Sequence, residues 1–170
     1  MRLTGEKGGK KQLMNIEELY RTYFEIVYRY IRSISRDEIL AEEITQETFF
    51  KALKKADEFR GECDVRVWLC QIAKNTLYDQ LKKQKKYLPN EEALEQTESE
   101  SGGNFEEKLA QKSEAMEIHK VLHGIQEPYK EVFSLRTFGE LSFREIGMIF
   151  GKSENWARVT YYRARVKIRE

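Results

Sequence analysis

The sequence SFREIGMIFGKSENWARVTYYRARVKIR, from Ser142 to Arg169, carries the clearest structural signals in this chain. Ser142 followed three residues later by Glu145 predicts a capping box, in which the two side chains satisfy free backbone N–H groups at a helix start. Gly151 fits the left-handed position that commonly ends a helix, and Ser153 can cap the next one. We therefore predict a helix, a tight turn and a second helix, the order of a helix-turn-helix motif.

The second helix of this motif has two chemically different sides. An apolar stripe at helical spacing predicts the side that packs inward; its members are Ala157, Tyr161, Ala164 and Ile168. Polar and basic residues lie on the other side, mainly in the first half of the helix, where a recognition helix reaches base edges. The alternative is a solvated charged face on a structural helix, but the capping box, the glycine turn and the one-sided arginines together favour DNA binding.

A further helix is predicted directly before the motif. Pro128 fits the first turn of a helix, Tyr129, Val132, Phe133 and Leu135 form its buried side, and Gly139 ends it.

The first half of the chain also reads as helical. Apolar residues recur at steps of three and four between Ile16 and Ile34, and Asp37 can cap the helix that follows. A short break is expected at Phe59-Arg60-Gly61. The third helix then contains Val65 and Leu77 and ends in a cluster of lysines. We expect these three helices to pack on one core.

The sequence therefore predicts an all-α protein of two small helical domains joined by a flexible acidic linker. The expected boundaries are a disordered extension over 1–13, a first domain over 14–87, a linker over 88–107 and a helix-turn-helix domain over 108–170. The linker is inferred from its composition, which is rich in Pro, Gly, Ser and Glu and poor in apolar residues.

Charge is arranged in opposed blocks along the chain. The net charge of the 170 residues is only +1, but a lysine cluster at 82–86 precedes five glutamates within 91–100, and the last helix is again basic. Two basic surfaces flanking an acidic spacer are consistent with nucleic-acid binding. No apolar run approaches the roughly 18 residues of a membrane span, and two cysteines without a secretion signal indicate a reducing, cytoplasmic compartment.

No pattern of residues points to catalysis, a metal or a cofactor. His119 and His123 lie one helical turn apart, but no third ligand is nearby, so two ordinary helix-surface histidines are the preferred interpretation. There is no nucleophile–base pair and no phosphate-binding loop. We expect neither enzymatic activity nor a small-molecule substrate.

The third helix combines basic groups with an aromatic ring. Trp68 precedes Lys74 and Asn75 on this helix, and single-stranded or melting DNA needs cations for its phosphates and aromatic faces for its unstacked bases. A lone Trp in a three-helix domain is more commonly a core residue, and we prefer that interpretation for Trp68 taken alone.

Together these motifs resemble RNA polymerase sigma factors of the extracytoplasmic-function (ECF) type. Ala41-Glu42-Glu43-Ile44-Thr45-Gln46-Glu47-Thr48-Phe49 and the later Phe59-Arg60-Gly61, Trp68-Leu69 and Ile72-Ala73-Lys74-Asn75 are similar to the second conserved region of that family. Tyr129 to Arg136, Ser142 to Gly147 and Tyr162 to Arg165 are similar to the fourth. No third region lies between them, which is typical of the ECF group.

The resemblance implies a role for each half of the chain. One helix face would dock on the clamp helices of core RNA polymerase, through Glu43, Gln46, Glu47 and Phe50. The loop from Arg60 to Val67 would capture a base flipped from the minus-ten promoter element. The residues implied at the minus-ten element are Arg60, Gly61, Trp68, Lys74, Asn75, Lys82 and Lys83.

The second domain would bind the minus-thirty-five element and the polymerase flap. The residues implied there are Arg144, Ser153, Asn155, Trp156, Arg158, Val159, Thr160 and Arg163. The chain departs from the family here, because Trp156 is bulky and Thr160 stands where an arginine is common. The family also implies an anti-sigma partner, often membrane-anchored, which would hold the chain at the inner face of the membrane.

Two rival functions remain from the residues alone. A stand-alone helix-turn-helix regulator would bind a palindromic duplex without polymerase. A protein-interaction module mimicking such a factor would bind no DNA, and the basic recognition helix argues against it.

Overall fold

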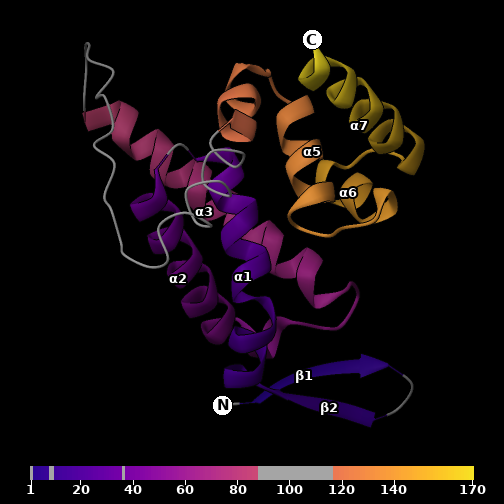
Figure 1. Ribbon diagram of the computed structural model, residues 1–170. Coiled ribbons are helices and arrows are strands. Elements are labelled where there is room, and N and C mark those ends of the chain that lie inside the picture. The colour runs from indigo at the N-terminus through magenta and orange to yellow at the C-terminus, as the bar shows by residue number, and fades with distance from the viewer. Residues whose placement is uncertain (1, 8–9, 36, 88–116) are drawn as a thin grey trace, which may run out of the picture.

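A computed structural model describes residues 2–7, 10–35, 37–87 and 117–170, and helices build both halves of the protein (Figure 1). The first half contains α1 (Ile16–Ile34), α2 (Glu38–Lys54), the short 3-10 helix η1 (Ala56–Glu58) and α3 (Val65–Tyr87). The second contains helical residues 117–124 followed by α5 (Tyr129–Thr137), α6 (Phe143–Phe150) and α7 (Glu154–Arg169). The predicted all-α, two-domain fold is confirmed. The expected linker and the start of the second domain lie outside the described residues.

The first domain is a three-helix bundle, as predicted. Asn15 caps α1 by accepting the backbone N–H of Glu17. The Asp37 carboxylate accepts the N–H groups of Ile39 and Leu40 and so begins α2. Both other helices of the domain pack on α1. Its core includes the fully buried Leu19, Ile44, Leu69 and Leu77, with Tyr30 the largest of the buried side chains.

The helix-turn-helix is built by the predicted caps. The Ser142 hydroxyl accepts the Glu145 N–H, and the Glu145 carboxylate accepts the Ser142 N–H, which completes the capping box. Gly151 is left-handed with φ 62°, and the Ser153 hydroxyl accepts the Trp156 N–H at the start of α7. The Lys152 N–H donates to the Gly147 carbonyl, which closes the turn between α6 and α7.

The first residues of the chain differ from the expected disordered extension. Strands β1 (Arg2–Lys7) and β2 (Lys10–Asn15) form an antiparallel hairpin in which Lys7 pairs with Lys10, next to the start of α1 (Figure 1). Hydrogen bonding between segments so close in sequence needs no apolar run, which is why hydropathy alone did not predict the hairpin.

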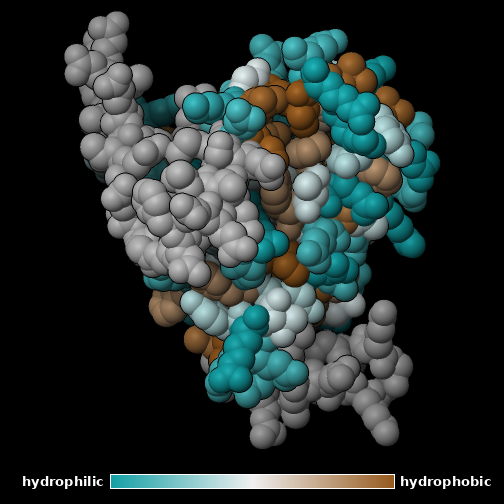
Figure 2. Space-filling model, viewed as in Figure 1, coloured by the Kyte–Doolittle hydropathy of each residue, from teal (hydrophilic) through white to brown (hydrophobic). Residues whose placement is uncertain are grey.

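The two domains pack against each other. Helix α5 contacts α1, and α6 contacts α3. One continuous cluster of buried apolar side chains includes Tyr30 and Leu77 of the first domain together with Val132, Leu141 and Ile146 of the second. In Figure 2 hydrophobic residues show through along the central strip where α5 lies. None of the described helices combines the length and apolarity needed to cross a membrane.

Candidate nucleic-acid and polymerase interface

One exposed face of α2 gathers the four residues expected to bind polymerase. Glu43, Gln46, Glu47 and Phe50 are all exposed, and Phe50 keeps 55% of its surface accessible. Spacings of three and four residues place them on one side of the helix, while Ile44 and Phe49 point into the core. Lys54 lies over the Phe50 ring at 4.3 Å. The face is therefore acidic and apolar together.

A polar groove of about 530 Å³ runs between α2 and α3 beside this face. Its lining includes Glu47 and Lys51 of α2 and Asp79, Lys82 and Lys83 of α3. The structure thus brings the expected polymerase-binding Glu47 next to two lysines expected at the minus-ten element. Sequence reasoning assigned these residues to separate sites, whereas here they border one surface.

The loop before α3 holds the residues expected to capture a base. Arg60 is exposed, and Gly61 adopts φ 71°, a left-handed conformation that favours glycine. Trp68 is only partly buried, with its ring centroid 4.7 Å from that of the buried Phe59. One part of the indole therefore packs in the domain, and another part remains accessible beside the loop.

Lys74 is separated from the other basic residues of α3. Asn75, Lys82 and Lys83 are exposed, but the Lys74 side chain is only 19% exposed. Its Nζ lies 3.2 Å from Glu131 Oε1 and 4.0 Å from the centroid of the Phe150 ring. Both partners belong to the second domain. In this arrangement Lys74 does not join the surface that the sequence predicts for it.

The outward side of α7 carries most of the residues expected at the minus-thirty-five element. Asn155, Arg158, Val159 and Arg163 are exposed on α7, as are Ser153 before it and Arg144 on α6. Hydrophilic residues predominate over α7 in Figure 2. Arg158 forms an ion pair with Glu154 at 2.7 Å and its guanidinium lies 5.7 Å from the Phe143 ring centroid. These two contacts orient the Arg158 side chain along the helix surface.

Two expected contact residues of α7 pack inward instead. Thr160 is 6% exposed, because it lies three residues after Ala157 and four before Ala164, the buried stripe of the helix. Its side chain is not available to read DNA here, which corrects the expectation. Trp156 is partly buried, 5.2 Å from the Phe150 ring, so much of its surface is used to hold α7 on α6.

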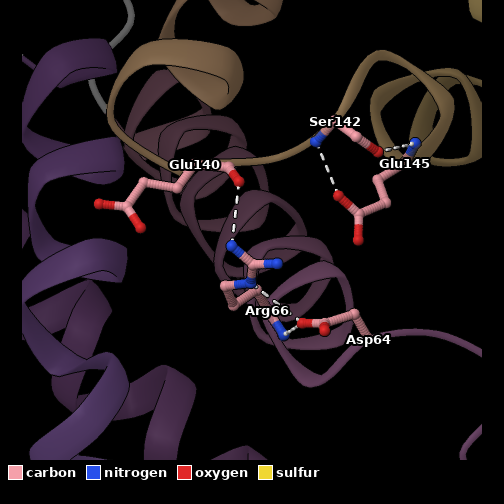
Figure 3. Close-up of polar contacts among 5 residues, drawn as sticks. All are labelled: Asp64, Arg66, Glu140, Ser142 and Glu145. Carbon is pink, nitrogen blue, oxygen red and sulfur yellow. Dashed lines mark hydrogen bonds and ion pairs between the residues drawn. The ribbon is translucent and has the colours of Figure 1, made fainter.

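Sequence reasoning missed a set of polar residues between the domains. Glu131 of α5 is buried, with 4% of its side chain exposed, and it accepts hydrogen bonds from the hydroxyls of Tyr30 and Tyr78 at 3.3 and 3.4 Å. Arg66 donates to the Glu140 carbonyl at 3.1 Å (Figure 3). The sequence contained one signal of this cluster. Glu131 places a carboxylate directly beside Val132, on the apolar side of a short helix.

Burial controls the protonation chemistry of this cluster. Removal from water raises the pKa of the Glu131 carboxyl, and the neighbouring Lys74 ammonium opposes that rise. Burial, with the Glu131 charge second, also raises the pKa values of Tyr30 and Tyr78. Both hydroxyls therefore remain donors, as their contacts with Glu131 require.

Comparison with known proteins identifies both halves of the chain. Residues 19–87 match Sigma-70 region 2, and residues 115–168 match Sigma-70, region 4. RNA polymerase sigma factor YlaC of Bacillus subtilis is 30% identical over 92% of this chain and 91% of its own length. ECF RNA polymerase sigma factor SigM of the same organism is also 30% identical, over 92% of this chain and 94% of its own.

Solved structures show the same fold. CnrH in complex with the cytosolic domain of CnrY superposes with a TM-score of 0.68 at 20% identity, covering 90% of this chain and 84% of that one. The sigma factor RpoE of Bartonella quintana, in complex with the anti-sigma factor NepR, also gives 0.68, at 19% identity over 89% and 92% of the two chains.

Proposed function

Because the chain belongs to the ECF subfamily of RNA polymerase sigma factors, we propose that its exposed faces divide promoter recognition between the two domains. The chain is a transcription-initiation factor that binds core RNA polymerase and directs promoter-specific initiation. It is not a stand-alone regulator, since region 2 and region 4 both match and in the family's order. The observation that carries the division is that separate helices present the acidic–apolar face and the basic face.

We assign polymerase binding to α2. The exposed carboxylates of Glu43 and Glu47 and the exposed Phe50 ring suit a helical partner that offers both cations and apolar contacts. The groove between α2 and α3 extends this surface toward Lys82 and Lys83. DNA held on α3 would therefore pass directly beside the polymerase. We assign the contact with the polymerase flap to the second domain, region 4.

Minus-ten recognition is assigned to the loop from Arg60 to Val67 and to α3. Extruding a base costs a few kcal/mol, and a loop that captures the extruded base offsets that cost only for a base that fits. Capture of the extruded base then provides both the sequence selectivity and the strand opening. The exposed Asn75, Lys82 and Lys83 would hold the adjacent phosphates.

Minus-thirty-five recognition is assigned to α6 and α7. Asn155, Arg158 and Val159 occupy the first half of α7, the part of a recognition helix that reaches base edges. We assign the exposed Arg144 and Arg163 to contacts with the DNA backbone or the bases beside them. Thr160 is left out of the contact set because its side chain is buried.

An anti-sigma factor is the further partner that we propose. The Bartonella quintana relative of similar fold was solved in complex with one. We expect the chain to act in the cytoplasm, where core polymerase is found, and a membrane-anchored anti-sigma factor would hold it at the inner face of the membrane. The proposed role requires no cofactor, metal, catalytic residue or small-molecule substrate.

Run-off transcription tests the proposed function directly. Purified core polymerase is incubated with genomic fragments, with and without this chain. We expect promoter-specific transcripts only when the chain is present. Tight binding of the chain alone to duplex DNA, with no promoter-specific transcript, would refute the assignment.

A further inference from the structure

The hairpin formed by β1 and β2 concentrates positive charge. Its two strands contain four basic residues and one acidic residue, a net charge of +3. The basic residues are Arg2, Lys7, Lys10 and Lys11, and the acidic residue is Glu6. The complete chain has a net charge of only +1. The two strands therefore hold more net positive charge than all 170 residues together.

The register of the hairpin places like charges opposite each other. Lys7 pairs with Lys10, and next to them Glu6 pairs with Lys11. Residues at opposite positions of an antiparallel ladder are neighbours, and like charges at such positions oppose the pairing. A bound polyanion would remove that repulsion. The two paired lysines therefore favour a binding role for the hairpin over a purely structural one.

The backbone fixes the position of the hairpin on the first domain. Strand β2 ends at Asn15, which caps α1 directly, so no linker separates the hairpin from the bundle. Strand β1 packs against η1, and η1 leads into the loop that is assigned to base capture. Figure 1 shows the hairpin at the lower end of the bundle, where the loop between η1 and α3 also lies. The hairpin therefore borders the minus-ten surface.

The base-capture loop itself is poor in available cations. From Ala56 to Val67 the chain contains four acidic residues and two arginines, a net charge of −2. The acidic residues are exposed: Asp57, Glu58, Glu62 and Asp64. One of the arginines, Arg66, is already paired with Asp64 at 3.1 Å. Phosphates on either side of a flipped base would therefore meet a net negative segment, unless cations come from a neighbouring element.

We propose that the β1–β2 hairpin is a further DNA-binding element, whose basic residues contact backbone phosphates beside the minus-ten element. Its location on the promoter rests on the proposed assignment of the loop from Arg60 to Val67 to that element. Each lysine that neutralises a phosphate releases condensed counterions and adds affinity without sequence preference. A two-stranded β-ribbon also fits the major groove of duplex DNA. The hairpin would hold the DNA while the loop selects the base.

Salt-dependent DNA binding by the full chain alone tests the hairpin without polymerase. The probes are a short fluorescein-labelled duplex and one of its strands alone, and fluorescence anisotropy follows binding at several salt concentrations. Lys7→Gln combined with Lys10→Gln and Lys11→Gln should weaken duplex binding by about tenfold and reduce the slope of log K against log salt concentration by roughly 2, since each phosphate contact contributes about 0.9 to that slope. A loss confined to the single strand would assign the contact to melted DNA instead of paired DNA.

Matched variants separate a local contact from overall charge and from misfolding. Arginine at the same three positions keeps the charge and should restore wild-type binding. Arg21→Gln combined with Arg29→Gln and Lys120→Gln removes three positive charges at exposed positions outside the hairpin. This control variant should keep most of the affinity. The thermal unfolding midpoint should stay close to that of the wild type in all three combinations.

Footprinting on the polymerase complex tests where the hairpin binds. Hydroxyl radicals are applied to core polymerase, the chain and a promoter fragment that run-off transcription has identified. The variant with three glutamines should lose protection of the DNA backbone beside the minus-ten element and retain protection at the minus-thirty-five element. Lost protection at the minus-thirty-five element alone would overturn the proposed location.

The hairpin proposal and the proposed function fail in different ways. Equal affinity and equal slope in the glutamine variant and the wild type overturn the hairpin proposal whatever transcription shows, and so does an equal loss in the control variant. A lower unfolding midpoint with unchanged DNA binding would show that the lysines only stabilise the fold, which also overturns it. Absence of any transcript from the wild type overturns the proposed function, and binding by the chain alone still decides whether the hairpin contacts DNA.

Discussion

At the scale of single residues, Gly147 sets how closely α6 approaches the turn before α7. A Cβ atom at this position would lie 2.7 Å from the Lys152 carbonyl oxygen and 3.0 Å from that of Ser153. Both are backbone atoms, so they cannot move aside without displacing the turn that positions the recognition helix.

Gly147→Ala should therefore destabilise the protein by about 2 kcal/mol, within the range of overpacking substitutions in well-packed regions. Gly124→Ala is the matched control, since nothing lies within 4 Å of a Cβ there; as a helical position it should gain up to about 1 kcal/mol. Urea unfolding measures both free energies. Equal stability of the two variants would contradict the close packing at Gly147.

Glu140 adopts a left-handed conformation with φ 57°, although the sequence suggested that the neighbouring Gly139 would end α5. Glu140→Gly should stabilise the fold by about 1 kcal/mol, because glycine avoids the clash that L side chains suffer in this region. The hydrogen bond from Arg66 uses the backbone carbonyl and should persist. Glu25→Gly, inside α1, should instead lose about 1 kcal/mol. Thermal unfolding compares the stability of the two variants. A loss of stability in Glu140→Gly would argue against the left-handed conformation of this residue.

At the scale of elements, α2 and α7 are expected to act independently. Gln46→Ala combined with Glu47→Ala should weaken binding to core polymerase by about tenfold, since interface hot spots cost 1 kcal/mol or more on truncation. Arg158→Ala should leave that affinity unchanged and reduce promoter selectivity. Arg21→Ala is the matched control, because Arg21 also pairs with a glutamate one helical turn earlier. Fluorescence anisotropy measures binding to core polymerase, and run-off transcription measures promoter selectivity. A variant that loses both core binding and promoter selectivity would contradict the division of roles between α2 and α7.

The helical residues 117–124 offer a pH test of their docking. Burial lowers the pKa of His119 from its ordinary value of 6.5, the Arg32 charge lowers it further, and Glu38 opposes both. The folded state therefore binds the proton less tightly than the unfolded state. The contribution to stability is fully present above the unfolded pKa, is lost as the pH falls below it, and levels off below the lowered folded pKa.

His119→Phe should flatten this dependence between about pH 7 and pH 5.5, the range in which an ordinary histidine titrates. Denaturant unfolding across that range measures the free energy of unfolding of both proteins. Because all other groups are shared, the difference between the two curves isolates His119. Parallel curves would show that the side chain is not docked against Arg32 and the start of α2.

At the scale of the whole molecule, one apolar cluster and one polar cluster make the domains a single unfolding unit. Buried side chains from both halves belong to the same core, so the wild type should unfold in one calorimetric transition. Glu131→Lys places a second cation against Lys74 and should resolve two transitions by undocking region 4. The control variant Glu25→Lys should retain a single calorimetric transition. Two transitions in the wild type would show that the domains unfold independently.

The sequence by itself determined the main helices of both domains and several of their ends. The cap at Asp37, the capping box of Ser142 and Glu145, and the left-handed Gly151 were predicted and are present. Each depends on backbone groups within about four positions of the side chain, so local order is enough to specify them. The motifs that identify the family lie on these same helices.

Only the tertiary structure decided which polar residues are accessible. Lys74 is withdrawn by Glu131, and Tyr30 meets the same carboxylate from 101 residues away in the chain. Thr160 is turned inward by the packing of α7, and Glu140 takes the left-handed conformation that the turn between α5 and α6 imposes. A helical pattern fixes the face on which a side chain lies, but the burial of that face depends on a partner surface that is distant in sequence.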